Sequence, residues 1–286
     1  MRSKQSSLTA AGIAITRAIE SEKPEDERIC NDPFARYLVS GWLYAITAFF
    51  VRTGYAEWRG PGVMGYIVVR ERYIDDVVRE QLTNGLKQLV ILGAGYDSRA
   101  YRFNGLIEHI KVFEVDHPAT QADKLKKLDE ILDELPPHVT YVPMDFKTQS
   151  LEKRLLESGF SSKLKTLFIW QGVSMYLTPE AVDATLRFVA SHSAPGSAII
   201  FDYLERQVLE GKERHVEVIN MHRYRFMSGE ELTYAIDPNK LKSFLMERGF
   251  RFVQNMNATE LMQIYCTGKN SGRKIASGYG IALAFV

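Results

Sequence analysis

Short apolar runs and helix-like segments alternate along most of this 286-residue chain, and this alternation limits the possible folds more than any other feature. Seven runs rich in β-branched and aliphatic residues predict strands, and helical segments lie between the first six. This pattern is typical of a Rossmann-like, doubly wound and mostly parallel sheet, so the predicted fold class is α/β. The predicted strands are Gln88–Leu92, Ile110–Val115, Val139–Pro143, Leu167–Trp170, Ala198–Phe201, Phe250–Gln254 and Tyr279–Phe285.

No low-complexity linker interrupts the chain, which predicts a single domain over residues 1–286. An N-terminal extension over residues 1–85 is predicted to be helical, with helices at Leu8–Glu20, Phe34–Phe50 and Met64–Leu82. Residues 86–203 form the predicted core of the sheet, and residues 239–286 its C-terminal part. The intervening residues 204–238 are too long and too polar for a simple crossover helix, so we expect a cap over a ligand site.

Composition excludes several classes of protein. Lysine and arginine (36) nearly balance aspartate and glutamate (35), so no nucleic-acid partner is expected. Cys30 and Cys266 form no CxxC pair, which predicts neither a disulfide framework nor a thiolate metal site and favours a cytoplasmic protein. The apolar run Gly41–Val51 has about half of the ~20 residues that cross a bilayer, so we expect a buried or interfacial helix and no membrane partner.

The residues directly after each strand deserve the closest inspection, because open parallel sheets bind ligands beyond the carboxyl ends of their strands. Gly93 and Gly95 follow the first strand and let the backbone approach a ligand closely, although they could merely shape the turn. Ser98 stands where a dinucleotide-binding loop has its third glycine. A pyrophosphate, and with it a nicotinamide oxidoreductase, is therefore disfavoured.

Two further strand ends carry side chains that suit a nucleoside. Asp116 ends the second strand about 20 residues after the glycine turn, the spacing at which a carboxylate accepts from ribose hydroxyls. It could instead cap the following helix. Asp145 and Phe146 follow the third strand and suit an adenine, whose amine a carboxylate binds and whose face a ring covers. The alternative is a loop aspartate beside a core phenylalanine.

The fourth and fifth strand ends and the cap supply the remaining candidates. Gln171 follows the fourth strand, and the glycine after it leaves room for a ligand. Tyr203 ends the fifth strand and faces an acceptor substrate in one interpretation. His222 and Tyr224 lie in the cap segment together with Arg223. These three cap residues are candidates for acceptor binding or proton transfer, with a plain surface role as the alternative.

With these residues in view, the chain resembles the class I S-adenosylmethionine-dependent methyltransferases of the leucine carboxyl methyltransferase-like family, in the bacterial branch of polyketide-associated O-methyltransferases. The resemblance runs from residue 7 to late in the chain, so it is more specific than a GxG turn. Its segments are SLTAAGIAITRAIESEKPEDERICNDPFARYL, VVRERYIDD, VILGAGYDSRAYRF, FEVDHPATQADK, YVPMDF, WQGVSMYLTPEAV, ERGF and ATEL.

The resemblance implies roles for these residues toward S-adenosyl-L-methionine. The turn at Gly93 and Gly95 passes its methionine part, Asp116 holds the ribose, and Asp145 with Phe146 holds the adenine. Arg70 meets the carboxylate, with Arg72 as its competitor. Gln171 binds the amino group where the family commonly has an acid, which predicts weaker affinity. The last strand is implied to be antiparallel.

The leading functional hypothesis is an O-methyltransferase that acts on a hydroxyl or carboxylate of a small molecule by in-line displacement. Such a reaction needs the acceptor oxygen aligned and water excluded, and a carboxylate acceptor needs no base. The catalytic candidates are Tyr203, His222 and Tyr224, and no metal is expected. Carboxyl methylation of a protein C-terminus is the first alternative. A non-catalytic S-adenosylmethionine-binding protein, which Gln171 keeps open, is the second.

Overall fold

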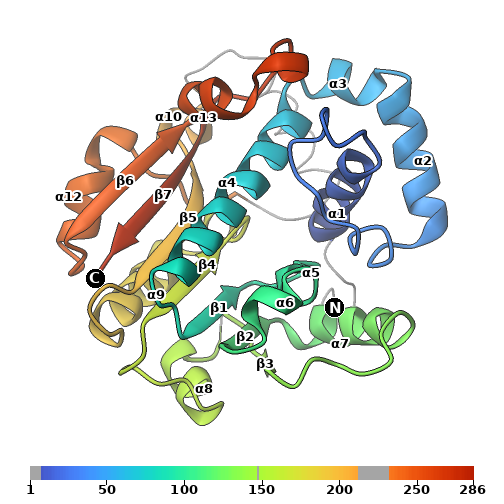
Figure 1. The fold of residues 1–286 in the computed structure, drawn as a ribbon. Helices are drawn as coiled ribbons and strands as arrows, with labels where there is room; N and C mark the ends of the chain where they lie inside the picture. The colour runs from blue at the N-terminus through green and yellow to red at the C-terminus, as the bar shows by residue number, and fades with distance from the viewer. Residues whose placement is uncertain (1–7, 147, 212–231) are drawn as a thin grey trace.

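The structure is a computed structural model that describes residues 8–146, 148–211 and 232–286, and Figure 1 shows its fold. Its seven strands form one sheet in the order β3-β2-β1-β4-β5-β7-β6. Strand β7 runs antiparallel to the other six, which are parallel to one another. The α/β class, the mostly parallel sheet and the antiparallel last strand are therefore confirmed. The strands are β1 (Gln88–Leu92), β2 (Lys111–Asp116), β3 (Val139–Pro143), β4 (Thr166–Trp170), β5 (Ala198–Leu204), β6 (Phe252–Asn257) and β7 (Tyr279–Phe285).

Helices precede the sheet and connect its strands. The α-helices are α1 (Leu8–Ser21), α2 (Gly41–Arg52), α3 (Tyr55–Arg59), α4 (Val63–Thr83), α5 (Arg99–Arg102), α6 (Asn104–Ile107), α7 (Pro118–Asp129), α8 (Leu151–Glu157), α9 (Pro179–Ser191), α10 (Arg206–Leu209), α12 (Leu241–Met246) and α13 (Ala258–Tyr265). Single 3₁₀ turns are η1 (Ser174–Tyr176), η2 (Pro238–Lys240) and η3 (Gly268–Asn270). The helical segment between the first two strands consists of two short helices, α5 and α6.

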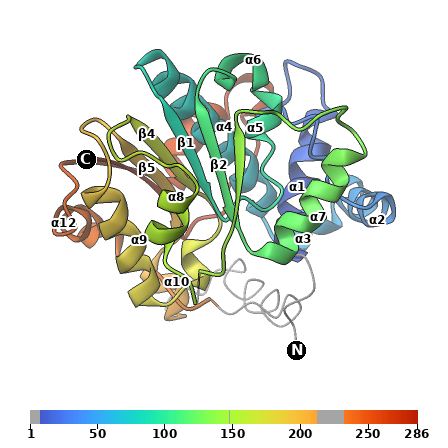
Figure 2. The same cartoon turned by 90° about the horizontal axis from the view of Figure 1, so that it is seen from below.

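Two layers of helices cover the sheet, because successive strand residues point to opposite faces. Leu89 and Ile91 of β1 pack in one apolar cluster with α1, α4, α6 and α13, whereas Val90 and Leu92 pack in another with α8, α9 and α12. Figure 2 shows α8, α9 and α12 on one side of the sheet and α4, α5 and α6 on the other. Helices α1 and α4 of the N-terminal extension therefore belong to the layer that covers the Leu89 and Ile91 face of the sheet.

The apolar run predicted to form a buried or interfacial helix is helix α2, and it is only partly buried. Within it only Tyr44 and Ala48 are buried, whereas Trp42 and Phe49 are 68% and 62% exposed. The predicted helix over 34–50 starts later, at Gly41, because residues 33–38 form turns. In the first of these turns the Asp32 side chain accepts the Ala35 N–H (3.1 Å). Of the helices in the three described ranges, none combines the length and the apolar character that a membrane span requires.

Candidate functional site

A pocket of about 640 Å³ lies beyond the carboxyl ends of β1, β2, β3 and β4. Helix α1 forms a further wall through Thr9, Ile13 and Arg17, and Thr233 reaches the pocket from the described part of the predicted cap. The pocket is where a doubly wound sheet binds its ligand. All the residues predicted to hold the cofactor line it: Arg70, Gly93, Gly95, Asp116, Asp145, Phe146 and Gln171.

The turn after β1 takes a shape that its glycines permit. Gly93 has a φ of +68°, and a Cβ there would collide with the side chain of Val173. Gly95 also has a positive φ, and its N–H donates to Oδ2 of Asp116. The backbone therefore comes close to the pocket at this turn, and the same turn holds the carboxylate at the end of β2 in place.

The Asp116 carboxylate is held by backbone donors at both oxygens. Oδ1 accepts the His117 N–H (2.6 Å), and Oδ2 accepts the Gly95 N–H. Burial raises the pKa of Asp116, while these two N–H groups act in the opposite direction. The predicted alternative, a helix cap, falls to His117, whose Nδ1 accepts the Ala119 N–H (3.2 Å) at the start of α7. Asp116 is left to face the pocket.

Arg70 and its sequence competitor Arg72 lie in very different places on α4. Arg70 is 4% exposed and pairs through Nη1 with Asp202, which also accepts the Gly172 N–H (2.6 Å). Among the described residues, Nε and Nη2 of Arg70 have no hydrogen-bond partner. Arg72 pairs with Asp76 (3.0 Å) on the exposed side of α4 and does not line the pocket. Arg70 therefore lines the pocket with a buried guanidinium, two of whose nitrogens have no hydrogen-bond partner among the described residues.

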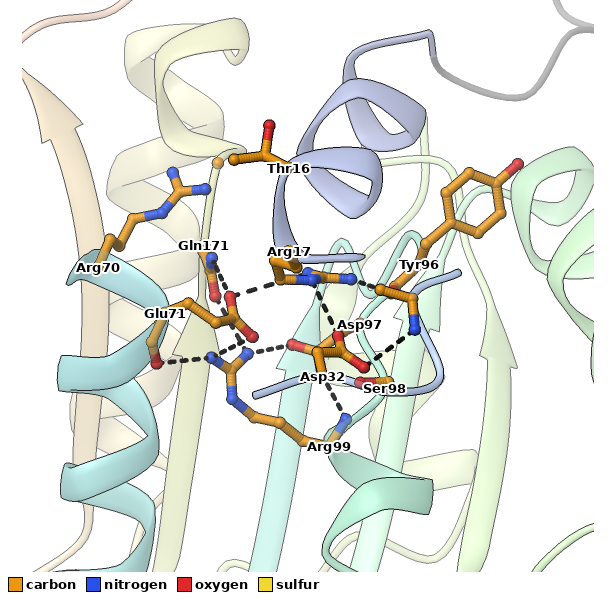
Figure 3. Close-up of polar contacts among 12 residues, drawn as sticks. Thr16, Arg17, Asp32, Arg70, Glu71, Tyr96, Asp97, Ser98, Arg99 and Gln171 are labelled. Carbon is orange, nitrogen blue, oxygen red and sulfur yellow. Dashed lines mark hydrogen bonds and ion pairs between the residues drawn. The ribbon is translucent and has the colours of Figure 1, made fainter. Parts of the chain in front are cut away.

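A buried ion-pair cluster, which sequence reasoning missed, adjoins the pocket through Arg17 and Asp97, and Figure 3 shows its central contacts. Arg17 reaches it from α1 and pairs with Asp32 (2.9 Å), while its Nη2 donates to the carbonyl of Tyr96 in the glycine turn. Arg99 pairs with Glu71 (2.9 Å) at the centre. The cluster consists of Arg17, Asp32, Glu71, Asp75, Asp97, Arg99 and Arg102.

Gln171 joins this cluster to the pocket. Its Nε2 donates to Oε2 of Glu71 (2.9 Å), and its Oε1 accepts from Nη1 of Arg99 (3.1 Å). Burial alone would raise the pKa of Glu71, but the guanidinium groups of Arg99, Arg17 and Arg102 hold it well below its usual range. Glu71 is therefore a charged group next to the pocket residue Gln171. The charged sequence RER around Glu71, on an otherwise buried helix, was the available signal.

The catalytic candidates are not brought together. The prediction that Tyr203 faces an acceptor is wrong, because its side chain is fully buried away from the pocket and its hydroxyl donates to Oδ1 of Asn255 (3.0 Å). His222 and Tyr224, with Arg223, lie outside the described residues. Residues that sequence reasoning did not assign to the acceptor end are Tyr176 and Thr233, which line the pocket.

Comparison with known proteins gives sequence matches over most of the chain. The family described as "Leucine carboxyl methyltransferase" matches residues 10–190. The "Putative S-adenosyl-L-methionine-dependent methyltransferase YktD" of Bacillus subtilis (strain 168) is 33% identical over 71% of this chain and 66% of its own length. A protein of the same description, SCO7813 of Streptomyces coelicolor, is 31% identical over 71% of this chain and 70% of its own length.

Solved structures resemble the fold at low sequence identity. A methyltransferase structure from Thermobifida fusca aligns with 96% of this chain and 94% of its own, with a TM-score of 0.60 and 14% identity. A protein of the duf574 family from Streptomyces avermitilis aligns with 99% and 98%, with a TM-score of 0.60 and 12% identity. At these identities the likeness shows the shared fold.

Proposed function

Because the chain belongs to the leucine carboxyl methyltransferase family of S-adenosylmethionine-dependent methyltransferases, we propose that it methylates an oxygen atom of a small molecule. The acceptor group is a hydroxyl or a carboxylate. The observation that carries the proposal is the pocket itself, which gathers the expected cofactor residues and continues past Tyr176 to Thr233 of the cap. A pocket of about 640 Å³ is within the range that takes small ligands.

The residues present fit S-adenosylmethionine. Nε and Nη2 of Arg70 are buried and have no hydrogen-bond partner among the described residues. A planar pair of donors of this kind matches a carboxylate. Asp116 presents a carboxylate to the part of the pocket next to the glycine turn, as binding to ribose hydroxyls requires. Phe146 lines the same pocket and supplies a ring face beside Asp145.

The bound cofactor supplies an electrophilic methyl group on a positively charged sulfur. The protein's part is to hold the acceptor oxygen in line with that group and to keep water away. Helix α1 and Thr233 line two sides of the pocket. A site lined from several elements supports a small acceptor over the C-terminus of a folded protein, which needs an open groove.

The test is transfer of a radiolabelled methyl group to a panel of small carboxylic acids, phenols and alcohols, with peptides ending in a free carboxylate alongside. We expect label in a small-molecule class and none in the peptides. Labelled peptides would favour the alternative substrate, and cofactor binding without transfer to any acceptor would favour a non-catalytic protein. The cytoplasmic location suggested by the cysteines stays a prediction.

The variant control for this assay is Asp116→Ala, compared with Asp129→Ala on the exposed side of α7. Loss of hydrogen bonds to a charged acceptor should weaken cofactor binding by about ten- to a hundredfold. Asp129→Ala should bind like the wild type in calorimetry. Equal cofactor affinities for the two variants would show that Asp116 does not contribute to cofactor binding.

A further inference from the structure

The amide of Gln171 can take only one orientation in this structure. One end faces a carboxylate, Glu71, which only accepts hydrogen bonds, and the other faces a guanidinium, Arg99, which only donates them. The Nε2 group must therefore point to Glu71 and the Oε1 atom to Arg99 (Figure 3). Glu71 thus fixes which atoms of Gln171 remain for a ligand in the pocket.

The buried ion-pair cluster is not neutral. Its three guanidinium groups and four carboxylates leave one formal negative charge. Glu71 at its centre is fully buried, contacts Arg99 and Arg102 at 2.9 Å each, and is linked to the pocket through Gln171. Because the buried surroundings have a low dielectric constant, the charge of Glu71 attracts a cation that lies on the other side of Gln171 more strongly than it would in water.

A carboxylate at position 171 would be incompatible with this arrangement. It would stand about 2.9 Å from the oxygen of Glu71, and two carboxylates at that distance share one proton. Glutamine at 171 therefore satisfies both Glu71 and Arg99 without an added proton, so the absent acid is not by itself a sign of a lost site.

We propose that Glu71 and Gln171 act as a matched pair that binds the amino group of the cofactor's methionine part. Glu71 supplies the negative charge, and Gln171 presents Oε1 as the contacting acceptor. Glu71 is then a positioning residue, and Gln171 the residue that touches the ligand. This inference deepens the proposed function and rests on its cofactor, not on the identity of the acceptor.

The experiment is calorimetric binding to four proteins: the wild type, Glu71→Gln, Gln171→Glu and the exchange variant with both substitutions. The ligands are S-adenosylmethionine, S-adenosylhomocysteine and 5′-methylthioadenosine. The first two carry the amino group, and the third lacks it. We expect each single variant to bind the first two about tenfold more weakly, and the exchange variant to return within about threefold of the wild type.

Binding of 5′-methylthioadenosine separates positioning from general damage. We expect all four proteins to bind it alike, since it has no group for Gln171 to contact. If Glu71→Gln weakens this ligand as much as S-adenosylmethionine, the substitution has distorted the pocket and the proposal is overturned. The proposal is likewise overturned if the exchange variant binds S-adenosylmethionine no better than the weaker single variant.

Asp75→Asn is the matched control. It removes one negative charge from the same cluster, where Asp75 pairs with Arg99 (2.8 Å) and Arg102 (2.6 Å), but it does not touch Gln171. We expect lower thermal stability with cofactor affinity within about threefold of the wild type. If Asp75→Asn loses as much cofactor affinity as Glu71→Gln, the net charge of the cluster determines binding and the Glu71–Gln171 pair has no specific role. Failure of the proposed function would appear separately, as binding without methyl transfer.

Discussion

Arg70 lines the pocket, pairs with Asp202 through Nη1 and keeps two buried nitrogens without a partner among the described residues, so we expect the shape of the guanidinium to matter as much as its charge. Arg70→Lys keeps a cation beside Asp202 but loses the planar fork. We expect about tenfold weaker cofactor binding with little change in unfolding temperature. Arg72→Lys, on the exposed side of the same helix, should bind normally. Equal losses in both variants would reassign the contact to Arg72.

The raised pKa of Asp116 predicts a pH dependence of cofactor affinity. Binding to ribose hydroxyls is strongest with an ionised carboxylate, and burial places protonation at a higher pH than for an ordinary aspartate, about 3.9. Affinity should therefore begin to fall on acidification before an unperturbed carboxyl would protonate. Calorimetry across the acid range, with Asp116→Asn as the comparison, checks this. A parallel fall in Asp116→Asn would assign the pH dependence to another group.

At the scale of elements, α4 packs closely against the chain that precedes β7 because Gly65 in this helix has no side chain. A Cβ on Gly65 would collide with the carbonyl oxygen of Lys274. Alanine normally stabilises a helix by about 0.5–1 kcal/mol over glycine, but here we expect Gly65→Ala to cost about 1–3 kcal/mol. Urea unfolding measures the difference.

Gly105 in α6 provides the control, because a Cβ there meets nothing within 4 Å. Gly105→Ala should be neutral or stabilising by up to about 1 kcal/mol. The same sign of change in both variants would show that helix propensity, and not the contact with Lys274, decides stability in α4.

The strands could be predicted because periodicity and buried aliphatic runs determine them locally. Gln88–Leu92, Val139–Pro143 and Tyr279–Phe285 have the predicted bounds. Helix α13 was missed although Asn257 and Glu260 form its capping box, a local signal that the sequence does contain. The later start of α2 has a local cause as well, since the turn before it includes the Ala35 N–H bonded to the Asp32 side chain.

The residues predicted to hold the cofactor line one pocket because, apart from Arg70 on α4, they follow strand ends, where the topology brings them together. The ion-pair cluster could not be, since Arg17, Glu71 and Arg99 are far apart in the chain and meet only through the packing of α1 and α4 on the sheet. Tyr203 failed for a related reason: its place at a strand end does not show which face of the sheet it points to.

At the scale of the whole molecule, the cluster makes stability depend on pH. The folded-state pKa of Glu71 lies below its unfolded value, so its ion pairs stabilise fully above about pH 4.3, and this contribution is lost as pH falls toward the folded pKa. The wild-type free energy of unfolding should fall more steeply on acidification than that of Glu71→Gln. Glu157→Gln, at exposed ion pairs with Lys153 and Arg154, should keep the wild-type slope.

Segments from before and after the parallel strands meet beside the pocket wall. Arg273 pairs with Glu20 at the end of α1 (2.8 Å), and the Ala276 N–H donates to the carbonyl of Gly62 just before α4 (2.9 Å). Helix α1, which lines the pocket, is thus fixed at its C-terminal end by a residue that is synthesised long after the helix itself. In a growing chain, we expect this wall of the pocket to be complete only once the segment before β7 has been synthesised.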